Sequence, residues 1–409
     1  MNCVVLKFGG TSLGNNKKIK LVSDLIIDKL KVNKKIIVVV SAMAGSTDEL
    51  INKTQVYKNC KFNSEYDTVI SSGEQVSAGL MSLLLNSKNI NARSVMGWQI
   101  PIVTDAMSGK AKILNINTEN IKNFFKVHDV LVVAGFQGID SKQRITTLGR
   151  GGSDTSAVAL AVAVGASFCE IYTDVDGIFT ADPRIIKKAK KISKISYEEI
   201  LEMASLGSKV LHPRSVELAM KYAMKVYVKS SFSKNLGTLV TQEEKTMEKE
   251  LISGISSTDD ESKITLIGIP DTPGVASKIF SPLSKSNINV DMIVQNITED
   301  GKFTNLTFTV HNSERMRAVN ALKKSNLKFR KIHVDKNICK VSIIGVGMRS
   351  NVGVAEKMFE ALAKNNVNIK VISTSEIKIS VLIDLNKKLV ALKSLHKVYG
   401  LDRKIVKKK

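Results

Sequence analysis

Aromatic side chains, prolines and long apolar runs are all scarce in this 409-residue chain. Aromatic residues make up 5% of it and tryptophan occurs once, so Val, Ile, Leu, Ala and Met must supply the core. No apolar run approaches the roughly 18 residues of a membrane-spanning helix. The N-terminal MNCVVLKFGG lacks the basic stretch and apolar segment of a secretory signal. We therefore expect no membrane partner.

Cysteine and histidine are also sparse. Cys3, Cys60, Cys169 and Cys339 lie far apart and form no Cys-x-x-Cys pair, which predicts reduced thiols in a cytoplasmic protein. The five histidines lack metal-ligand spacing. We expect neither a disulfide framework nor a metal held by the protein's own side chains.

Acidic residues are outnumbered, and the formal net charge is +23. The lysines are spread over the whole chain with only small clusters, such as Lys187–Lys191 and Lys407–Lys409, and aromatic residues are not interleaved with them. This pattern favours a solvated basic surface over a nucleic-acid partner. An RNA-binding protein remains an alternative on charge alone, and salt-dependent retention on RNA would distinguish it.

The length predicts two or three domains. Up to about residue 245, strand-like runs such as 4–8, 36–40, 130–134 and 168–172 alternate with helical patterns. This order predicts an α/β fold with a mostly parallel sheet between helices. The polar stretch 241–250 is interpreted as a linker or an exposed helix.

The remainder contains an internal repeat. Residues 264–293 resemble 341–372, with Gly268 matching Gly345 and Asn289 matching Asn368. The first copy has a β-α-β-β-α-β pattern over 263–335. The second lacks its last strand, which the segment 250–257 could supply. We expect domains at 1–245, at 262–336, and at 250–261 plus 337–409, the last being discontinuous.

Two glycine-rich segments carry the chemistry. Lys7-Phe8-Gly9-Gly10 ends a strand, where glycines let backbone amides approach a phosphate and Lys7 supplies a cation. An ordinary turn with a surface lysine is the alternative for this segment alone. In Leu148–Ser156 a glycine-rich loop runs into a helix beside Arg150 and Asp154, which favours an anion site. Asp154 could orient a catalytic lysine or simply cap the helix.

Four further segments are weaker on their own. Ser41–Asp48 follows a strand, and Glu74 opens an apolar helix, where it could pair with an ammonium group or favour the helix dipole. The carboxylates of 173–184 could bind ribose hydroxyls. Lys209 lies at a glycine turn before His212, which has no Ser or Cys partner for a triad.

In this order, the stretches KFGGTS, SGEQVS, TTLGRGGSDTSA, YTDVDGIFTADPR and GSKVLHPR resemble the aspartokinases over essentially the whole chain. The repeat resembles paired ACT domains, which are α+β, ferredoxin-like, amino-acid-binding units. The chain is similar to the compact, lysine-sensitive aspartokinases of Gram-positive bacteria. It departs from the usual family pattern at Pro101 and at Ala44-Gly45.

The resemblance implies ATP with Mg²⁺ as cofactor, the Mg²⁺ being carried mainly by the nucleotide phosphates. It implies that Lys7 neutralises the transferring phosphoryl group and that Asp154 holds Lys7. ATP would be bound by Lys7, Phe8, Gly9, Gly10, Ser41, Thr173, Asp174, Phe179, Arg184 and Lys209. The substrate L-aspartate would be bound by Thr47, Glu74, Arg150, Gly151, Gly152 and Ser153, with Arg150 on a carboxylate and Glu74 on the ammonium group.

The resemblance also implies a reaction and its control. The product would be 4-phospho-L-aspartate, the first intermediate towards lysine, threonine and methionine. L-lysine, with threonine as a second candidate, would inhibit through the ACT domains of a homo-oligomer. The effector contacts would be Asp271, Gly274, Val275, Ala276, Asn289, Asp291, Gln295, Val354, Ala355, Asn368, Ile369, Ser375 and Glu376. Met247 could start a separate short subunit.

Two other readings of the sequence compete with this one. A kinase of the same fold acting on glutamate or acetylglutamate is the nearer, because Arg150 and Glu74 do not by themselves measure substrate length. A non-catalytic ACT sensor is the other, and intact Lys7, Asp154 and Arg150 argue against it.

Overall fold

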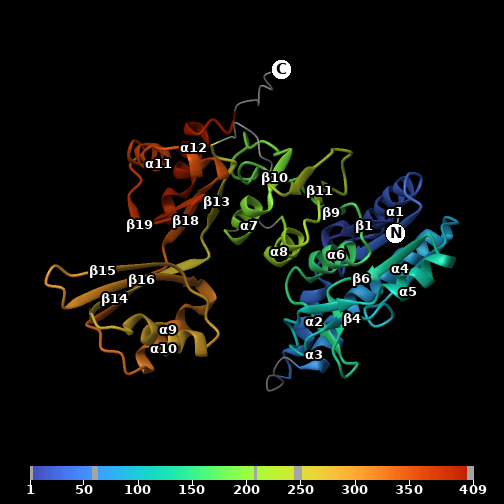
Figure 1. Cartoon of the computed structure of the whole chain (residues 1–409), viewed down its shortest axis with the longest axis horizontal. Coiled ribbons are helices and arrows are strands. Elements are labelled where there is room, and N and C mark those ends of the chain that lie inside the picture. Colours follow the sequence, from blue (N-terminus) through green and yellow to red (C-terminus); the bar gives the residue numbers. More distant parts are fainter. Residues whose placement is uncertain (1–2, 58–62, 207–209, 244–250, 403–409) are drawn as a thin grey trace. The chain divides into compact units, whose positions relative to one another are not determined.

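The computed structural model describes residues 3–57, 63–206, 210–243 and 251–402. The chain divides into two compact units, which are described separately below (Figure 1). The first comprises Met1–Ile178, Lys191–Ser205 and Lys209–Lys245, and the second Phe179–Lys190, Leu206–Ser208 and Thr246–Lys409.

An eight-stranded sheet with the order β10-β12-β11-β9-β1-β2-β6-β3 forms the centre of the first unit. Every pairing in it is parallel except β11 with β12. The β-branched runs of the central strands are buried on both faces, as a parallel sheet requires. The strands are β1 Cys3–Phe8, β2 Lys35–Val40, β3 Ala92–Val95, β6 Val130–Ala134, β9 Cys169–Thr173, β10 Lys194–Ser196, β11 Val226–Ser230 and β12 Thr238–Thr241.

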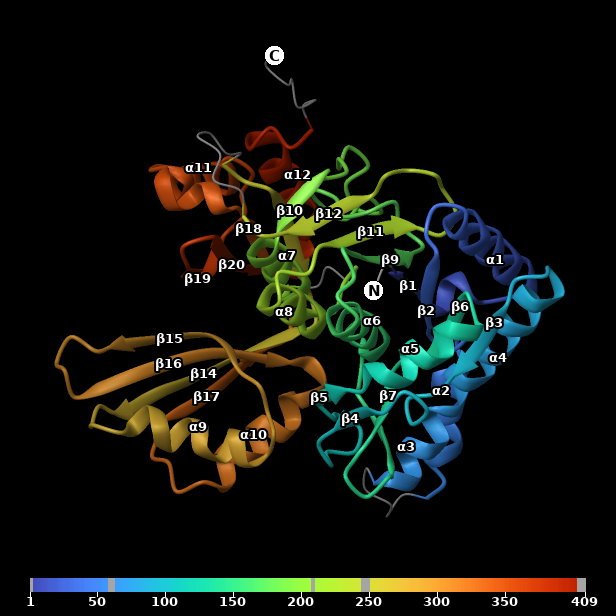
Figure 2. The same cartoon turned by 45° about the vertical axis from the view of Figure 1, so that its right-hand side comes forward.

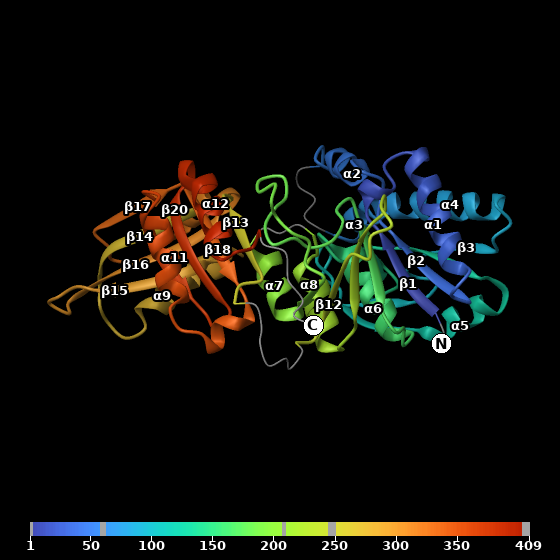
Figure 3. The ribbon, with the colours of Figure 1, turned by 90° about the horizontal axis from the view of Figure 1, so that it is seen from above.

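Helices cover both faces of this sheet (Figure 3). On one face α1 and α4 pack on alternate residues of β1, β2 and β6 in a single aliphatic core. On the other face α6 and α8 pack against β9, β11 and β12. The helices are α1 Asn16–Leu30, α2 Ser46–Thr54, α3 Ser64–Ile70, α4 Ser72–Ser87, α5 Thr118–Val127, α6 Gly152–Ala163, α7 Tyr197–Ser205 and α8 Pro213–Lys221.

A small second sheet, in the order β5-β4-β7-β8, belongs to the same unit (Figure 2). Its strands are β4 Ile102–Thr104, β5 Ile113–Ile116, β7 Gln137–Ile139 and β8 Ile145–Thr147. Strand β8 leads directly into the Leu148–Gly151 loop, so this sheet delivers that loop to the start of α6.

The first repeat folds as β14 Glu261–Pro270, α9 Val275–Lys285, β15 Asp291–Ile297, β16 Phe303–His311, α10 Arg315–Lys324 and β17 Lys331–Asp335. Its antiparallel sheet has the order β15-β16-β14-β17, and α9 and α10 pack on one face over a core of Ile264, Leu266 and Phe308 (Figure 2). This is the β-α-β-β-α-β pattern that the sequence predicts.

The second repeat contains β18 Ile338–Ile344, α11 Val354–Ala363, β19 Ile369–Thr374, β20 Lys378–Asp384 and α12 Lys388–Val398. Its sheet has the order β13-β18-β20-β19, and β13 Gly254–Thr258 pairs antiparallel with β18. The segment before the first repeat therefore completes the sheet of the second, which protects the edge of β18.

Phe179–Lys190 groups with the second unit, although the predicted boundary puts it in the kinase domain. Ala181 and Ile186 belong to the core of the second repeat. The Ile255 amide donates to the Thr180 carbonyl at 2.8 Å, and the Thr180 hydroxyl bonds His396 Nε2 at 3.1 Å. Tertiary contacts of this kind have no local sequence pattern.

Two local predictions are wrong. The expected strand 339–348 ends at Ile344, and Val346–Ser350 forms a 3-10 helix after Gly345. Asp154 does not cap α6, because Gly151 occupies the N-cap position in a left-handed conformation, with φ +69°. The predicted linker lies outside the described residues from 244 to 250.

Three further observations concern the cysteines, membrane-spanning helices and metal ligands. The cysteines that the structure describes, Cys3, Cys169 and Cys339, are buried free thiols. Among the described helices, none is long and apolar enough to cross a membrane. Within the described residues, no three His, Cys, Asp or Glu side chains gather as metal ligands.

Candidate active site and effector site

The candidate active site lies at the carboxyl ends of the central parallel strands. Lys7 is the penultimate residue of β1, and its Nζ is 2.5 Å from Asp154 Oδ1 in the first turn of α6. Both side chains are about one-tenth exposed, so this ion pair is shielded from solvent. Strand β1 and helix α6 thus bring together two residues that are remote in the sequence.

Of the two glycines after Lys7, Gly10 is required by a close backbone contact, whereas Gly9 has more room. A Cβ on Gly10 would lie 2.6 Å from the Ala42 carbonyl oxygen, and one on Gly9 would lie 3.4 Å from Lys7 Nζ. The Gly10 carbonyl accepts from the Ala44 amide at 3.2 Å. The loops after β1 and β2 therefore lie against each other. Because Gly9 has no side chain, space remains beside the Lys7 ammonium group.

Phe8 differs from the other residues predicted to bind ATP. Its side chain is fully buried and stacks on Tyr172 with ring centroids 4.8 Å apart. A nucleotide could meet only its backbone. The phenyl ring serves instead to fix the end of β1 against β9.

The Leu148–Ser153 loop approaches its neighbours closely. A Cβ on Gly151 would overlap the His212 ring at 2.2 Å, and one on Gly152 would lie 2.8 Å from Phe136. Burial lowers the pKa of His212 below its usual value. The first turn of α6 then lies beside a neutral ring, the ion pair and the exposed Arg150.

Glu74 lies in the first turn of α4 and is 3% exposed. Its Oε1 accepts from the Ala42 amide at 3.0 Å, whereas its buried Oε2 has no hydrogen-bond partner among the described residues. Burial raises the pKa of Glu74 to about 7. A buried carboxylate with one unused oxygen is a receptor for a cationic group.

The other predicted residues are dispersed. Ser41 follows β2, Thr47 is in α2, and Ser153 is buried in α6, where a Cβ on Gly135 would meet its side chain. Thr173 ends β9 and its hydroxyl accepts from the Val175 amide at 3.1 Å.

Three residues predicted to bind ATP are not among the described residues of the first unit. Phe179 and Arg184 belong to the second unit, where the Arg184 guanidinium contacts Asp182 at 2.8 Å. Lys209 lies outside the described residues. Their predicted roles stay predictions.

Sequence reasoning missed two residues that organise this region, Asp67 and Arg214. Asp67 is fully buried in α3, and Arg214 donates from Nη1 to the Leu148 carbonyl at 2.6 Å. Arg214 ends the GSKVLHPR stretch, and this motif could have pointed to a role for Arg214. Asp67 precedes SSGE by a few residues, and nothing in its local pattern predicts burial.

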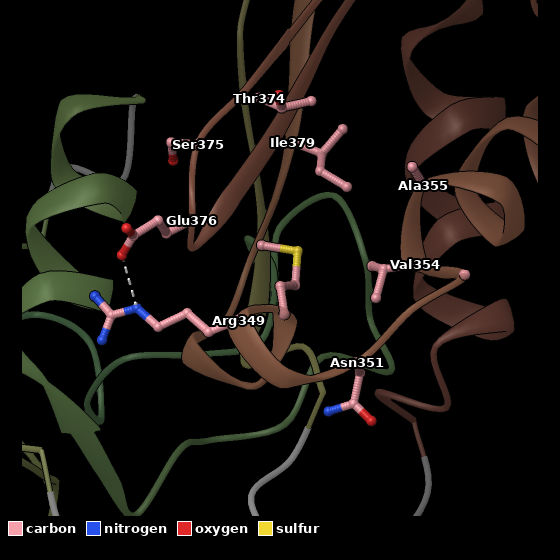
Figure 4. A pocket seen from close by; sticks show the side chains of 10 residues that line it. Arg349, Asn351, Val354, Ala355, Thr374, Ser375, Glu376 and Ile379 are labelled. Atoms are coloured by element: carbon pink, nitrogen blue, oxygen red, sulfur yellow. Dashed lines mark ion pairs between the residues drawn. The ribbon is translucent and has the colours of Figure 1, made fainter.

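The second repeat contains a cavity of about 530 Å³ at the start of α11 (Figure 4). Four residues predicted to bind an effector line it, namely Val354, Ala355, Ser375 and Glu376. Gly353 caps α11 with φ +81°, and Gly274 caps α9 of the first repeat in the same conformation, with φ +83°. Arg349 Nε lies 3.2 Å from Glu376 Oε2 across the cavity mouth.

The remaining predicted effector residues do not line this cavity. Asn368, Ile369, Asp271, Val275, Ala276, Asn289 and Gln295 lie elsewhere in the two repeats. Asp291 Oδ2 accepts from Lys340 Nζ of the second repeat at 2.7 Å. Burial raises the pKa of Asp291, but the Lys340 ammonium, the Met292 amide and Lys378 together lower it, and the net shift is downward.

The fold and site define an amino-acid kinase joined to ACT domains. The model of the amino acid kinase family matches residues 2–230, and that of the ACT domain matches 264–325 and 341–399. The chain is 49% identical over 405 residues to the aspartate kinase Ask_LysC of Stutzerimonas stutzeri, covering 98% of each chain. It is 45% identical to the aspartokinase of Helicobacter pylori, covering 98% of this chain and 100% of that one. The chain belongs to the aspartokinases and is an ATP-dependent phosphotransferase.

A solved structure agrees. Escherichia coli aspartokinase III, crystallised with aspartate and ADP, has a TM-score of 0.79 and 25% identity, covering 97% of this chain and 99% of that one. The predictions of family, fold class and enzyme class are confirmed.

Proposed function

We propose that this enzyme transfers the γ-phosphoryl group of ATP to the side-chain carboxylate of L-aspartate and yields 4-phospho-L-aspartate. The observation that carries the proposal is the buried Lys7–Asp154 ion pair at the glycine-lined ends of β1 and α6. This would be the first step towards lysine, threonine and methionine.

The chemistry needs charge neutralisation and little else. A carboxylate oxygen attacks the γ-phosphorus, and the bond from phosphorus to the β–γ bridging oxygen breaks to release ADP. Because the attacking group is already an anion, no general base is required. Lys7 would neutralise charge on the transferring group, and Asp154 would keep Lys7 aimed at it. The Gly10 amide would face the phosphates, and Gly9, whose own amide donates to the Tyr172 carbonyl at 3.3 Å, would let them approach closely. Mg²⁺ would travel with the nucleotide.

Aspartate would be held by its charged groups. Arg150 offers a planar fork to a carboxylate, and the unused Oε2 of Glu74 suits the α-ammonium group. Thr47, Ser153 and the Gly151 amide would add hydrogen bonds, and Gly152, whose own amide donates to the Gly149 carbonyl at 2.9 Å, would allow close backbone approach. Ser41, Thr173, Asp174, Phe179, Arg184 and Lys209 would contact the nucleotide.

We also propose feedback inhibition by L-lysine, with threonine as a second candidate, in a homo-oligomer joined through the ACT domains. The cavity beside Gly353 supports it, because the free amides at the start of α11 suit an α-carboxylate and Glu376 suits an ammonium group. Cytoplasmic location and a short subunit starting at Met247 complete the proposal. Detecting only the full-length chain in the native host would exclude the short subunit.

A coupled assay of ADP release tests the substrate. Aspartate should be phosphorylated with a far higher kcat/KM than glutamate or acetylglutamate, and activity should vanish with EDTA and return with Mg²⁺. Preferred turnover of glutamate would reject the proposed substrate while leaving the phosphoryl-transfer site intact. L-lysine and threonine are then titrated into the same assay.

A further inference from the structure

Asp67 is a buried carboxylate that the chemistry above does not use. It lies in α3 and is fully buried. Its oxygens accept from the Gly109 amide at 3.0 Å, the Thr147 amide at 3.1 Å and the Thr147 hydroxyl at 2.7 Å. Its hydrogen-bond partners are amides and hydroxyls rather than a lysine or an arginine. Burying a carboxylate in this way costs free energy, so we look for the backbone segments that its hydrogen bonds hold together.

Asp67 joins two segments that carry the proposed aspartate contacts. Helix α3 ends at Ile70 and continues through Ser71 into α4, whose first turn holds Glu74. Gln137 Nε2 donates to the Ser71 carbonyl at 3.0 Å and fixes this junction. Thr147, on the other side, ends β8 immediately before the loop that holds Arg150. The Asp67 carboxylate therefore links the helix that precedes Glu74 to the strand that precedes Arg150.

Arg214 fixes the same loop from α8. Its Nη1 and Nη2 donate to the Leu148 and Ala111 carbonyls at 2.6 and 2.9 Å. A Cβ on Gly149 would lie 2.9 Å from the Gly109 carbonyl oxygen, so the segment 109–111 packs directly on 147–149. The loop before Arg150 is therefore held from α3 and from α8, and only the α3 contact also leads to Glu74.

We propose that Asp67 is a positioning residue that holds the start of α4, with Glu74, against the loop that carries Arg150, and so sets the affinity for the amino-acid substrate. This inference rests on the proposed roles of Glu74 and Arg150. The two groups would bind charged groups of the same substrate, so a change in their relative position weakens aspartate binding without altering the nucleotide contacts. Displacements on the order of 1 Å are enough to cost about 100-fold in rate.

The test is the Asp67→Asn variant. Both Asp67 oxygens accept from N–H groups, so the new amide must turn its NH₂ towards the Gly109 or Thr147 amide. We expect the KM for aspartate to rise by about 10- to 100-fold. The KM for ATP should stay near wild type.

Asp140→Asn is the matched control. Asp140 is also buried and accepts from the Lys142 and Arg144 amides at 2.8 and 2.9 Å, but these bonds stay within the turn between β7 and β8. The control should keep the wild-type KM for aspartate. A second variant, Thr147→Val, removes one hydroxyl contact to Asp67 and should raise the KM for aspartate as Asp67→Asn does, even if the latter fails to fold. Thr147→Ser should restore the wild-type KM.

Three outcomes overturn the inference. They are unchanged aspartate kinetics in Asp67→Asn and Thr147→Val, an equal shift in Asp140→Asn, or an equal rise in the KM values for aspartate and ATP. The proposed site itself is tested by Glu74→Gln and Arg150→Lys. If those two variants leave the KM for aspartate unchanged, the site is wrong, whereas if only they raise it, Asp67 alone is misassigned.

Discussion

Lys7 Nζ and Asp154 Oδ1 lie 2.5 Å apart, and each side chain is about one-tenth exposed. Removing one partner of a buried ion pair leaves an uncompensated charge and is strongly destabilising. The pair therefore fixes the direction of the Lys7 ammonium group at the ends of the parallel strands.

Replacing Lys7 by Ala should lower kcat by about 100- to 1,000-fold, because a preorganised cation on the transferring phosphoryl group is lost. The KM for aspartate should change little. If Asp154 acts only by orienting Lys7, then Lys7→Ala with Asp154→Asn should be no slower than Lys7→Ala alone. Steady-state kinetics on Lys7→Ala, on Asp154→Asn and on the double variant measure this. Lys31→Ala, which removes an exposed lysine paired with Asp28, is the control and should be normal. If kcat fell by less than tenfold in Lys7→Ala, Lys7 would not be the catalytic cation.

Replacing Arg150 by Lys should raise the KM for aspartate by about tenfold or more, because a point charge cannot reproduce a bidentate fork. The dissociation constant for ATP, measured by calorimetry without aspartate, should stay the same. An unchanged KM for aspartate would remove Arg150 from the substrate site.

Aspartate binding should weaken below neutral pH through Glu74. Because burial raises its pKa to about 7, Glu74 loses its negative charge as the pH falls through that value. The KM for aspartate should then rise roughly tenfold per unit below pH 7, as expected for one linked proton. The KM values for aspartate and ATP across pH 5.5 to 8.5 report this, with Glu74→Gln as the pH-independent reference.

The same raised pKa affects stability with the opposite sign. The folded state binds this proton more tightly than the unfolded state, so the contribution of Glu74 to stability is present below the unfolded pKa and is lost as the pH rises to about 7. At pH 8 we expect Glu74→Gln to melt no lower than wild type. Added aspartate should raise the Tm of wild type only. A marked loss of Tm in the variant at pH 8 would contradict the pKa shift.

Asp291→Ala should reduce inhibition by L-lysine without lowering the uninhibited rate. Its carboxylate already pairs with Lys340, so an effector ammonium group would have to compete for it. Inhibition curves should move to higher lysine concentration by about tenfold, the usual size of an allosteric coupling. Asp335→Asn is the control, because it weakens another pair between the repeats, with Lys370 at 2.7 Å, and should keep normal sensitivity. Equal sensitivity of Asp291→Ala and wild type would exclude this carboxylate.

A fragment of residues 247–409 should be more stable than one of residues 262–409. The shorter fragment loses β13, which pairs with β18 from Gly254 to Thr258 and contributes Ile255 to the core. The exposed edge of β18 should also promote aggregation. Urea unfolding followed by circular dichroism compares the two, and equal midpoints would show that β13 is dispensable.

The sequence by itself determined the elements and the chemical inventory. Apolar periodicity located the strands and helices because burial repeats with the geometry of each element. The glycines beside Lys7 and before Asp154 marked the loops because few other residues tolerate such close backbone approach. The repeat also revealed two copies of one α+β unit.

Only the tertiary structure decided which groups meet. Lys7 and Asp154 are joined by the order of β1 and β9 and by the packing of α6, and no local pattern records that pairing. The burial of Asp67, the pKa of Glu74 and the pairing of Asp291 with Lys340 depend in the same way on residues remote in the chain. Periodicity reports which face of an element is buried, whereas hydrogen bonds and charges depend on what the opposite element presents.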